Sequence, residues 1–405
     1  MLKRIIDYSN KYFGLFDLIS GITDLRANPQ ISASDVSSSV LSMIFSNLGS
    51  LNKFNQSRDF SYAKNMALRV PSASTVARAS DTIDLDYVRE ILKSIYLKAK
   101  RSKMIEPFNG RYVGIVDGHE ICSSDIHRCK DCSVRNVSKM EGEVKLNYYH
   151  KYSAFILAGP KFCFLLDIEP IYPLEGELTS TLRLLERVCI NYPKAFDVVA
   201  GDGLYLNGAT FKLLESHHKY TIAILKDQRR ELYGEAMSLS AITAPVVYKD
   251  EGVTYRAWEH KISGLWDSYD KLVRVVRSEE TKTVRHHSDE LGKWDIQEER
   301  AEWMWVTNLP SVVGLKNIVS IGHSRWQIEN KCFNEIVNTW NADHIYRHNQ
   351  NAISAFILFL FIALNIFNIF FARNIKDKRI SSKTLLIDLI KAEYLLARWV
   401  RPIPV

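Results

Sequence analysis

The chain has 405 residues, which is enough for one large domain or for two to three ordinary ones. Its hydrophobic content of 46% is normal for a globular protein with a real core and excludes a mainly disordered chain. The formal net charge of +7, with an isoelectric point near 8.9, is a mild positive excess that suits a polyanionic partner.

Residues 1–105 are expected to form a helical N-terminal domain. Segments 33–54 and 84–104 have helical periodicity, and the segment between them, 70–81, reads as a short capped helix that carries Arg78. Residues 1–110 hold 15 Lys and Arg against 10 Asp and Glu. The pattern fits a small DNA-binding module and an ordinary helical bundle equally well. The first residues lack the apolar stretch and cleavage site of a signal peptide, so we expect a cytoplasmic protein.

Residues 106–227 change to a mixed α/β pattern. Strands are predicted at 111–118, 148–159 and 161–172, with a hairpin signal at Gly159-Pro160 between the last two. A helix at 178–192, a strand at 195–203, a helix at 209–218 and a strand at 220–226 follow. This order predicts a mixed sheet with helices packed on it.

Residues 228–310 break that rhythm and are expected to form a β-rich insertion, because the segment is too long to be a loop. Strand-like stretches lie at 245–250, 253–262, 271–280 and 301–309. Residues 311–405 return to helix. Their apolar run 352–372 is long enough to span a bilayer, but Asn365 and Asn368 interrupt it, and we expect a buried core helix.

Arg325 and Glu329 lie four residues apart in the predicted helix 314–340 and so share one of its faces. The apolar residues of this stretch fall roughly on one side: Trp326, Ile328, Phe333 and Ile336. By itself such an Arg–Glu pair is more often a surface salt bridge than part of an active site.

Two acids at the ends of predicted strands favour an active-site role for Glu329. Asp117 ends the first predicted strand and Asp202 ends the strand at 195–203. If these strands are neighbours, both carboxylates emerge at the edge where open α/β sheets place their sites. With Glu329 from the later helix, they would offer oxygen ligands to Mg²⁺ or Mn²⁺, and two such ions can clamp the oxygens of a phosphoryl transfer.

These acids lie in motifs that resemble those of bacterial insertion-sequence transposases of the D-D-E type. The matching stretches are "VDGHEICSS", "VVAGDGLY", "SRWQIEN" and "ADHIYRHNQNAISAFILF", over roughly residues 110–375. The resemblance implies an RNase H-like catalytic core, and the branch it resembles carries a β-strand insertion between the second acid and the Glu. It also implies a dimer on double-stranded transposon ends that cuts and joins DNA with two divalent metal ions.

The resemblance assigns Asp117, Asp202 and Glu329 as metal ligands and Arg325 as a phosphate contact. Gly322 stands where the family often has Tyr, and Ile336 where it often has Lys. Two other readings remain open: a DNA-binding protein derived from a transposase that has lost catalysis, and a metal-dependent nuclease that cuts DNA without joining it.

A cysteine–histidine stretch, "CSSDIHRCKDC", runs from Cys122 to Cys132. Cys129 and Cys132 form a C-x-x-C chelate, and His127 is the expected third ligand of a structural Zn²⁺, with His119 or His150 able to complete the set. The alternative is a pair of reduced core cysteines. With three of the six cysteines in this stretch and three scattered, the chain is not expected to have a disulfide framework.

Basic and aromatic residues give weaker signals. Lys226, Arg229 and Arg230 follow a strand near the expected site edge, where they could bind phosphates or simply form a solvated face. The insertion is enriched in tryptophan: Trp258, Trp266, Trp294, Trp303 and Trp305. In the family it resembles, one such aromatic can hold a flipped base, but most of these side chains are expected in the core of the insertion.

Overall fold

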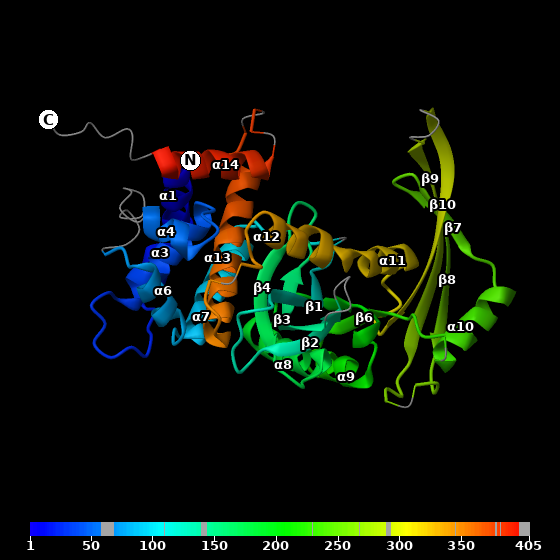
Figure 1. Cartoon of the computed structure of the whole chain (residues 1–405). Coiled ribbons are helices and arrows are strands. Elements are labelled where there is room, and N and C mark those ends of the chain that lie inside the picture. The colour runs from blue at the N-terminus through cyan, green and yellow to red at the C-terminus, as the bar shows by residue number, and fades with distance from the viewer. Residues whose placement is uncertain are drawn as a thin grey trace. The chain divides into compact units, whose positions relative to one another are not determined.

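The computed structural model describes residues 1–57, 69–108, 110–138, 144–228, 230–266, 268–288, 293–344, 346–376, 379–380 and 382–396 (Figure 1). The chain divides into two compact units, and each is built from separate segments. Unit 1 holds residues 1–106, 118–192 and 327–405. Unit 2 holds residues 107–117 and 193–326.

Unit 1 is mainly helical. Its N-terminal helices are α1 (Leu2–Phe13), α2 (Leu15–Ser20), α3 (Ala33–Phe45), α4 (Leu51–Ser57), α6 (Ala73–Ser80) and α7 (Leu85–Arg101). Its later helices are α8 (Glu177–Asn191), the π-helical turn η2 (Ile328–Phe333), α12 (Asn334–Asn338), α13 (Gln350–Asn374) and α14 (Lys383–Leu396).

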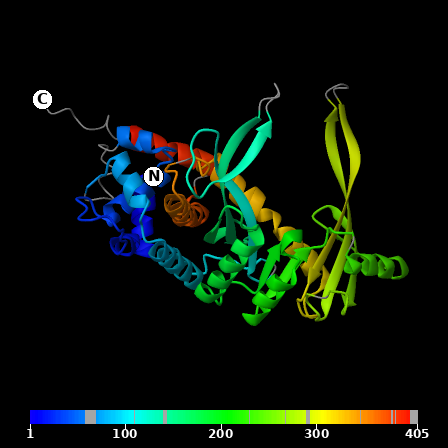
Figure 2. The ribbon, with the colours of Figure 1, turned by 60° about the horizontal axis from the view of Figure 1, so that its bottom comes forward.

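The apolar run forms α13, the central helix of unit 1. It packs against α1, α3, α6, α7 and strand β4 (Phe164–Ile171) and is seen nearly end-on in Figure 2. Among the described helices it alone is long and apolar enough to cross a membrane, and 89% of its most apolar window is buried inside the protein. The expected buried helix is therefore present.

Asn365 explains one polar interruption of α13. Its side-chain Oδ1 accepts a hydrogen bond from the Leu165 amide at 2.9 Å, and its Nδ2 donates to the Leu165 carbonyl at 2.7 Å. Leu165 lies in β4, so this one amide satisfies two buried main-chain groups of that strand.

Three strands of unit 1 follow β1. Strand β1 (Val113–Ser124) gives its residues from Gly118 onward to this unit. Strand β3 (Val144–Leu157) pairs with β1, and it pairs antiparallel with both β2 (Ser133–Ser138) and β4. The antiparallel β3–β4 pair confirms the predicted hairpin, whereas β2 had no strand signal in the sequence.

A buried charge network ties α7 and α8 to β4. The Asp167 carboxylate, only 1% exposed, accepts from Nε of Arg89 at 3.0 Å and from Nε of Arg187 at 2.7 Å. Glu169, two residues along β4, binds Arg187 and Arg183. The N-terminal helix α7 is thus anchored to the strand by paired, hydrogen-bonded charges.

Unit 2 contains a mixed sheet with the order β1–β5–β6–β10–β9–β8–β7. Its elements beyond β1 are β5 (Val198–Gly201), η1 (Gly203–Tyr205), α9 (Gly208–Ser216), β6 (Tyr220–Ile224), α10 (Glu231–Ile242), β7 (Val246–Asp250), β8 (Val253–Ile262), β9 (Val273–Ser288), β10 (Lys293–Thr307) and α11 (Leu315–Ser324). Strands β1, β5 and β6 are parallel, and β10 is antiparallel to β6.

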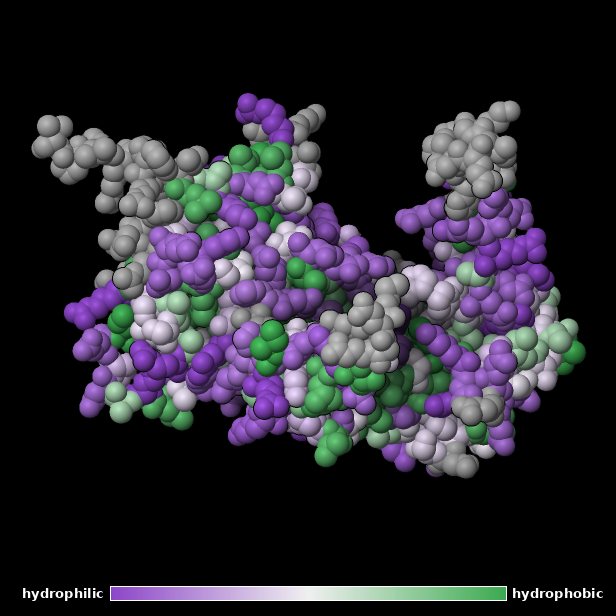
Figure 3. Space-filling view, in the orientation of Figure 1, coloured by the Kyte–Doolittle hydropathy of each residue, from purple (hydrophilic) through white to green (hydrophobic). Residues whose placement is uncertain are grey.

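The expected β-rich insertion is present as the antiparallel ladder β7–β10. Helix α10, which had no clear signal in the sequence, packs on it through Leu232 and Ala236. Hydrophilic side chains cover the part of β9 and β10 that lies below the grey end of the ladder (Figure 3), and cross-strand ion pairs such as Lys282–Glu299 at 2.9 Å join the two strands. The mixed α/β class with a helical N-terminal region is confirmed, while the domain boundaries at 105, 227 and 310 stay predictions.

Candidate functional site

Asp117 and Asp202 lie level with each other on neighbouring strands of unit 2. Strands β1 and β5 are parallel and pair Ile115 with Ala200. Each aspartate is two residues beyond its member of that pair, and side chains two residues apart lie on the same face of a strand. The neighbouring strands expected from the sequence are therefore present, and they bring the two half-buried acids to one edge of the sheet.

The turn after β5 fixes Asp202. One carboxylate oxygen accepts a hydrogen bond from the Leu204 amide at 2.8 Å, so Asp202 caps the short helix η1. Gly201 is required before it, because a Cβ there would lie 2.6 Å from the buried Tyr205 ring. The "GDG" sequence thus holds the second acid in a tight turn that its own side chain stabilises.

Arg325 reaches Asp117. Its Nη1 lies 3.2 Å from Asp117 Oδ2, and the arginine is 7% exposed, which excludes an exposed surface salt bridge. The residue stands at the C-terminal end of α11. Two carboxylates are hard oxygen donors that suit Mg²⁺, and a guanidinium beside them suits a phosphate through its planar fork. The donor set of this edge fits a magnesium-assisted reaction at a phosphate.

An aromatic cluster holds α11 and so positions Arg325. His323 packs edge-on against Trp305 at 5.0 Å, and its Nε2 lies 2.6 Å from Glu280 Oε1 on β9. A Cβ at Gly322 would lie 2.5 Å from the Trp305 indole. The buried indole therefore fills the space of a side chain at position 322, which explains the glycine there.

The tryptophans of the insertion differ in how far their side chains are buried. Trp258 and Trp305 are buried and Trp266 packs against the core of the insertion, as expected for most of them, whereas Trp303 is half-buried. The side chain of Trp294 lies outside the described residues. Trp326 is 37% exposed and packs edge-on against Trp303 at 4.8 Å, so it does not share the buried side of Ile328, Phe333 and Ile336.

Glu329 lies in the π-helical turn η2 of unit 1. Ile328 and Cys332 of this turn are buried, while Glu329 is exposed. Single π-turns inside helical segments are frequent at functional sites because they change the direction in which side chains project. The predicted continuous helix 314–340 is thus interrupted just where the third acid lies.

A further acid, Glu177, approaches Gly118 within unit 1 and carried no sequence signal. The Glu177 carboxylate, in the first turn of α8, occupies the space where a Cβ of Gly118 would be. Gly118 follows Asp117 directly. No local motif marks Glu177, because its approach to Gly118 depends on how α8 packs against β3 and β4.

The basic residues expected to bind DNA differ in exposure: Arg325 is buried, whereas Arg78 and Lys226 are exposed. Arg78 is exposed in the last turn of α6. Lys226 is exposed just after β6, and Arg230 is half-buried at the N-terminal end of α10. Arg229 lies outside the described residues.

Four side chains that could hold a metal ion lie together in unit 1: Cys129, Cys132, His150 and His348, whose ligand atoms all lie within 4.8 Å of one another. Cys129 and Cys132 were expected there and His150 was one candidate to join them. His348 was not foreseen, and His127 is exposed and not one of the four. Burial raises the pKa of the Cys129 thiol to about 11, so it is a poor nucleophile at neutral pH.

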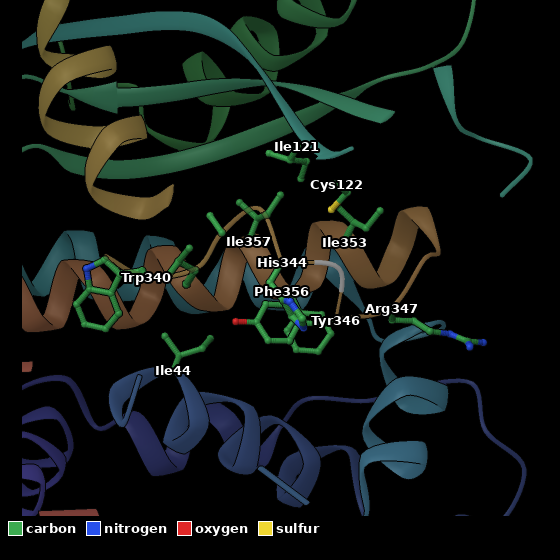
Figure 4. A pocket seen from close by; sticks show the side chains of 12 residues that line it. Ile44, Ile121, Cys122, Trp340, His344, Tyr346, Arg347, Ile353, Phe356 and Ile357 are labelled. Atoms are coloured by element: carbon green, nitrogen blue, oxygen red, sulfur yellow. The ribbon is translucent and has the colours of Figure 1, made fainter. Parts of the chain in front are cut away.

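Cys122, the first cysteine of the predicted cluster, lies away from the other two cysteines. It lines a small pocket of unit 1 with Ile121, Tyr346, Ile353 and other residues (Figure 4). Burial raises its pKa to about 12. Cys122 is therefore a protonated core thiol, apart from the four-residue cluster.

A family model described as "Transposase DDE domain" matches residues 110–366, which is more than half of the chain. No curated protein sequence matches the chain. With the mixed sheet and the N-terminal helices, the family match confirms the RNase H-like core that the sequence motifs implied.

Proposed function

Because the chain belongs to the DDE transposase family, we propose that it cuts the ends of a transposon and joins the freed ends to target DNA. The observation that carries this proposal is the register of β1 and β5, which places Asp117 and Asp202 level at one sheet edge, with Arg325 against Asp117. Such an edge suits a reaction at a phosphodiester.

In this proposal Asp117, Asp202 and Glu329 hold two Mg²⁺ or Mn²⁺ ions. When bound, the ions would stabilise the attacking and leaving oxygens of an in-line displacement at phosphorus. Glu329 follows Arg325 by four residues of largely helical backbone, about one turn, and Arg325 contacts Asp117. This spacing supports Glu329 as the third acid.

The protein side chains supply orientation and charge. Arg325 would contact a phosphate through its planar fork, and the Asp202 turn keeps one carboxylate oxygen on the Leu204 amide, which fixes the direction of the other. Lys226 would add positive charge just beyond β6, the strand next to β5, and Arg230 would add it at the start of α10.

The test is a cleavage and joining assay with labelled transposon ends in Mg²⁺. Asp117→Asn, Asp202→Asn and Glu329→Gln keep the shape of the side chain but remove its charge, and each should lower the rate about a thousand-fold or more while end binding persists. Glu231→Gln, which alters an exposed carboxylate on α10, is the matched control and should cleave normally. Near-normal cleavage by Asp202→Asn would refute the proposal.

The products of the wild-type protein separate the three readings. Joined products support a transposase. Cut ends without joining would instead point to a nuclease, and end binding without cleavage would point to a transposase-derived binding protein. Sedimentation with end DNA tests the proposed dimer, and cell fractionation tests the proposed cytoplasmic location.

Residues 1–105 are proposed to contribute to end binding. Deleting them is a poor test, because α3 and α7 pack on the buried helix α13. Arg78→Ala is sharper, since Arg78 is exposed. If Arg78 contacts a phosphate, its removal should weaken end binding and reduce the slope of log affinity against log salt by about one.

A further inference from the structure

We propose that Cys129, Cys132, His150 and His348 bind one Zn²⁺ ion in a closed structural site within unit 1. The side chains come from three places: the segment between β1 and β2, strand β3, and the segment between α12 and α13. Binding of the ion does not rest on the proposed DNA chemistry, although its consequence for the active site does.

Four of the distances between the ligand atoms are those expected around a tetrahedral Zn²⁺ ion, and one is shorter. With bonds of about 2.3 Å to sulfur and about 2.0–2.1 Å to nitrogen, tetrahedral Zn²⁺ separates two sulfurs by about 3.8 Å, sulfur and nitrogen by about 3.5 Å, and two nitrogens by about 3.4 Å. The two Sγ atoms lie 3.8 Å apart, each lies 3.4 Å from His150 Nε2, and the two Nε2 atoms are 3.3 Å apart. The Cys132 Sγ to His348 Nε2 distance, 2.9 Å, is shorter than the tetrahedral value, and Cys129 Sγ lies within 4.8 Å of His348 Nε2, so the His348 ring would have to shift when the ion binds.

The tautomer of His150 is already set for a metal. Its Nδ1 lies 2.9 Å from Gln350 Oε1, and the Gln350 amide nitrogen donates to Ser354 Oγ at 3.4 Å. Because the amide oxygen can only accept, Nδ1 carries the proton and Nε2 presents its lone pair to the other three ligands. Outer partners of this kind fix the rings of metal-binding histidines.

Other uses of the cluster fit less well. Sulfurs 3.8 Å apart are not joined in a disulfide, which needs about 2.05 Å. An iron–sulfur cluster with two His and two Cys ligands places the pairs on different irons, whereas all four ligand atoms here lie within 4.8 Å. Two thiolates and two imidazoles around one point are a typical zinc set.

The ion would link the parts of unit 1 that follow the catalytic acids. The segment carrying Cys129 and Cys132 continues from β1, the strand of Asp117. His348 stands between α12, which follows the Glu329 turn, and α13, which begins at Gln350. A structural zinc would therefore fix the continuation of β1 to the start of the central helix and limit movement of both chain segments.

Metal analysis of the full-length protein, purified without an affinity tag from zinc-supplemented medium, tests the site. We expect about one zinc per chain and, after exchange with Co²⁺, the visible absorption of a tetrahedral thiolate site. Zinc-free protein whose thermal midpoint is unchanged by Zn²⁺ would overturn the proposal.

Two histidine variants decide the ligand set. His348→Ala should lose the zinc, whereas His127→Ala, which removes a nearby exposed ring, should keep it. The reverse result would overturn the ligand assignment. Gln350→Ala leaves all four ligands in place and should weaken zinc affinity about 10–100-fold in a chelator competition. Unchanged affinity in Gln350→Ala would contradict the tautomer argument even if His348→Ala fails to fold.

The result is separable from the proposed DNA chemistry. Asp202→Asn should carry zinc at the wild-type ratio although it does not cleave DNA. Failure of cleavage in a zinc-replete wild-type protein would refute only the transposase function, and absence of zinc from a cleaving protein would refute only the metal site.

Discussion

The two asparagines of α13 offer a matched pair that isolates the hydrogen bonds of Asn365. Asn365→Leu removes the partner of both the amide and the carbonyl of Leu165, which are buried under α13. Each unsatisfied main-chain group costs about 1–3 kcal/mol, so the two together cost about 2–6 kcal/mol. Asn368, three residues later, is also buried, but its Oδ1 has no hydrogen-bond partner among the described residues.

Asn368→Leu makes the same chemical change and gains the same apolar side chain. The difference in the free energy of unfolding between the two variants therefore comes mainly from the lost hydrogen bonds to β4. Urea unfolding followed by circular dichroism and tryptophan fluorescence gives the two free energies. We expect Asn365→Leu to be less stable than Asn368→Leu by about 2–6 kcal/mol. Equal stability would refute the view that Asn365 is retained in this apolar helix to satisfy the strand.

The structure also predicts how two other substitutions change stability. Asp167→Asn should lower the free energy of unfolding by about 3–5 kcal/mol, because the buried carboxylate loses its charge and two half-buried guanidinium groups are left poorly paired. Glu298→Gln, in an exposed pair, should change the free energy of unfolding by under about 1 kcal/mol, and equal losses would contradict this. Burial lowers the pKa of His119, which stacks on Phe333 at 4.3 Å, so the unfolded chain binds its proton more readily and stability is lost as the pH falls below about 6.5. His119→Phe should therefore show a smaller drop in melting temperature between pH 8 and pH 5.5 than the wild type, and an unchanged drop would exclude His119 as a contributor.

The features that could be predicted from the sequence are those that short stretches of sequence determine. Strands that end in Asp117 and Asp202 are marked by apolar runs followed by an acid, and the order of elements made their strands neighbours. The apolar length of α13 predicted a central helix. The catalytic role of Asp117 and Asp202 is a proposal, because the register of β1 and β5 describes the positions of the two acids and not a reaction.

The features that could not be predicted depend on contacts between distant segments. His348 lies 216 residues from Cys132, so no ligand spacing connects them, and the nearer His127 was the natural choice. Glu177 approaches Gly118 only through the packing of α8, and Gly322 is explained only by the Trp305 indole. The π-turn at Glu329 leaves the sequence periodicity almost unchanged, because one wider turn shifts the pattern by only one residue.

Strand β10 belongs to both the ladder and the inner sheet of unit 2. Its residues 305–307 pair with β6, while its whole length pairs with β9. Removing residues 228–310 would therefore uncover the edge of β6 and leave its main-chain donors and acceptors open to a strand of another molecule, a common route to aggregation. The ladder protects this edge as well as extending the sheet, so a shortened variant should keep residues 305–307 and their pairing with β6.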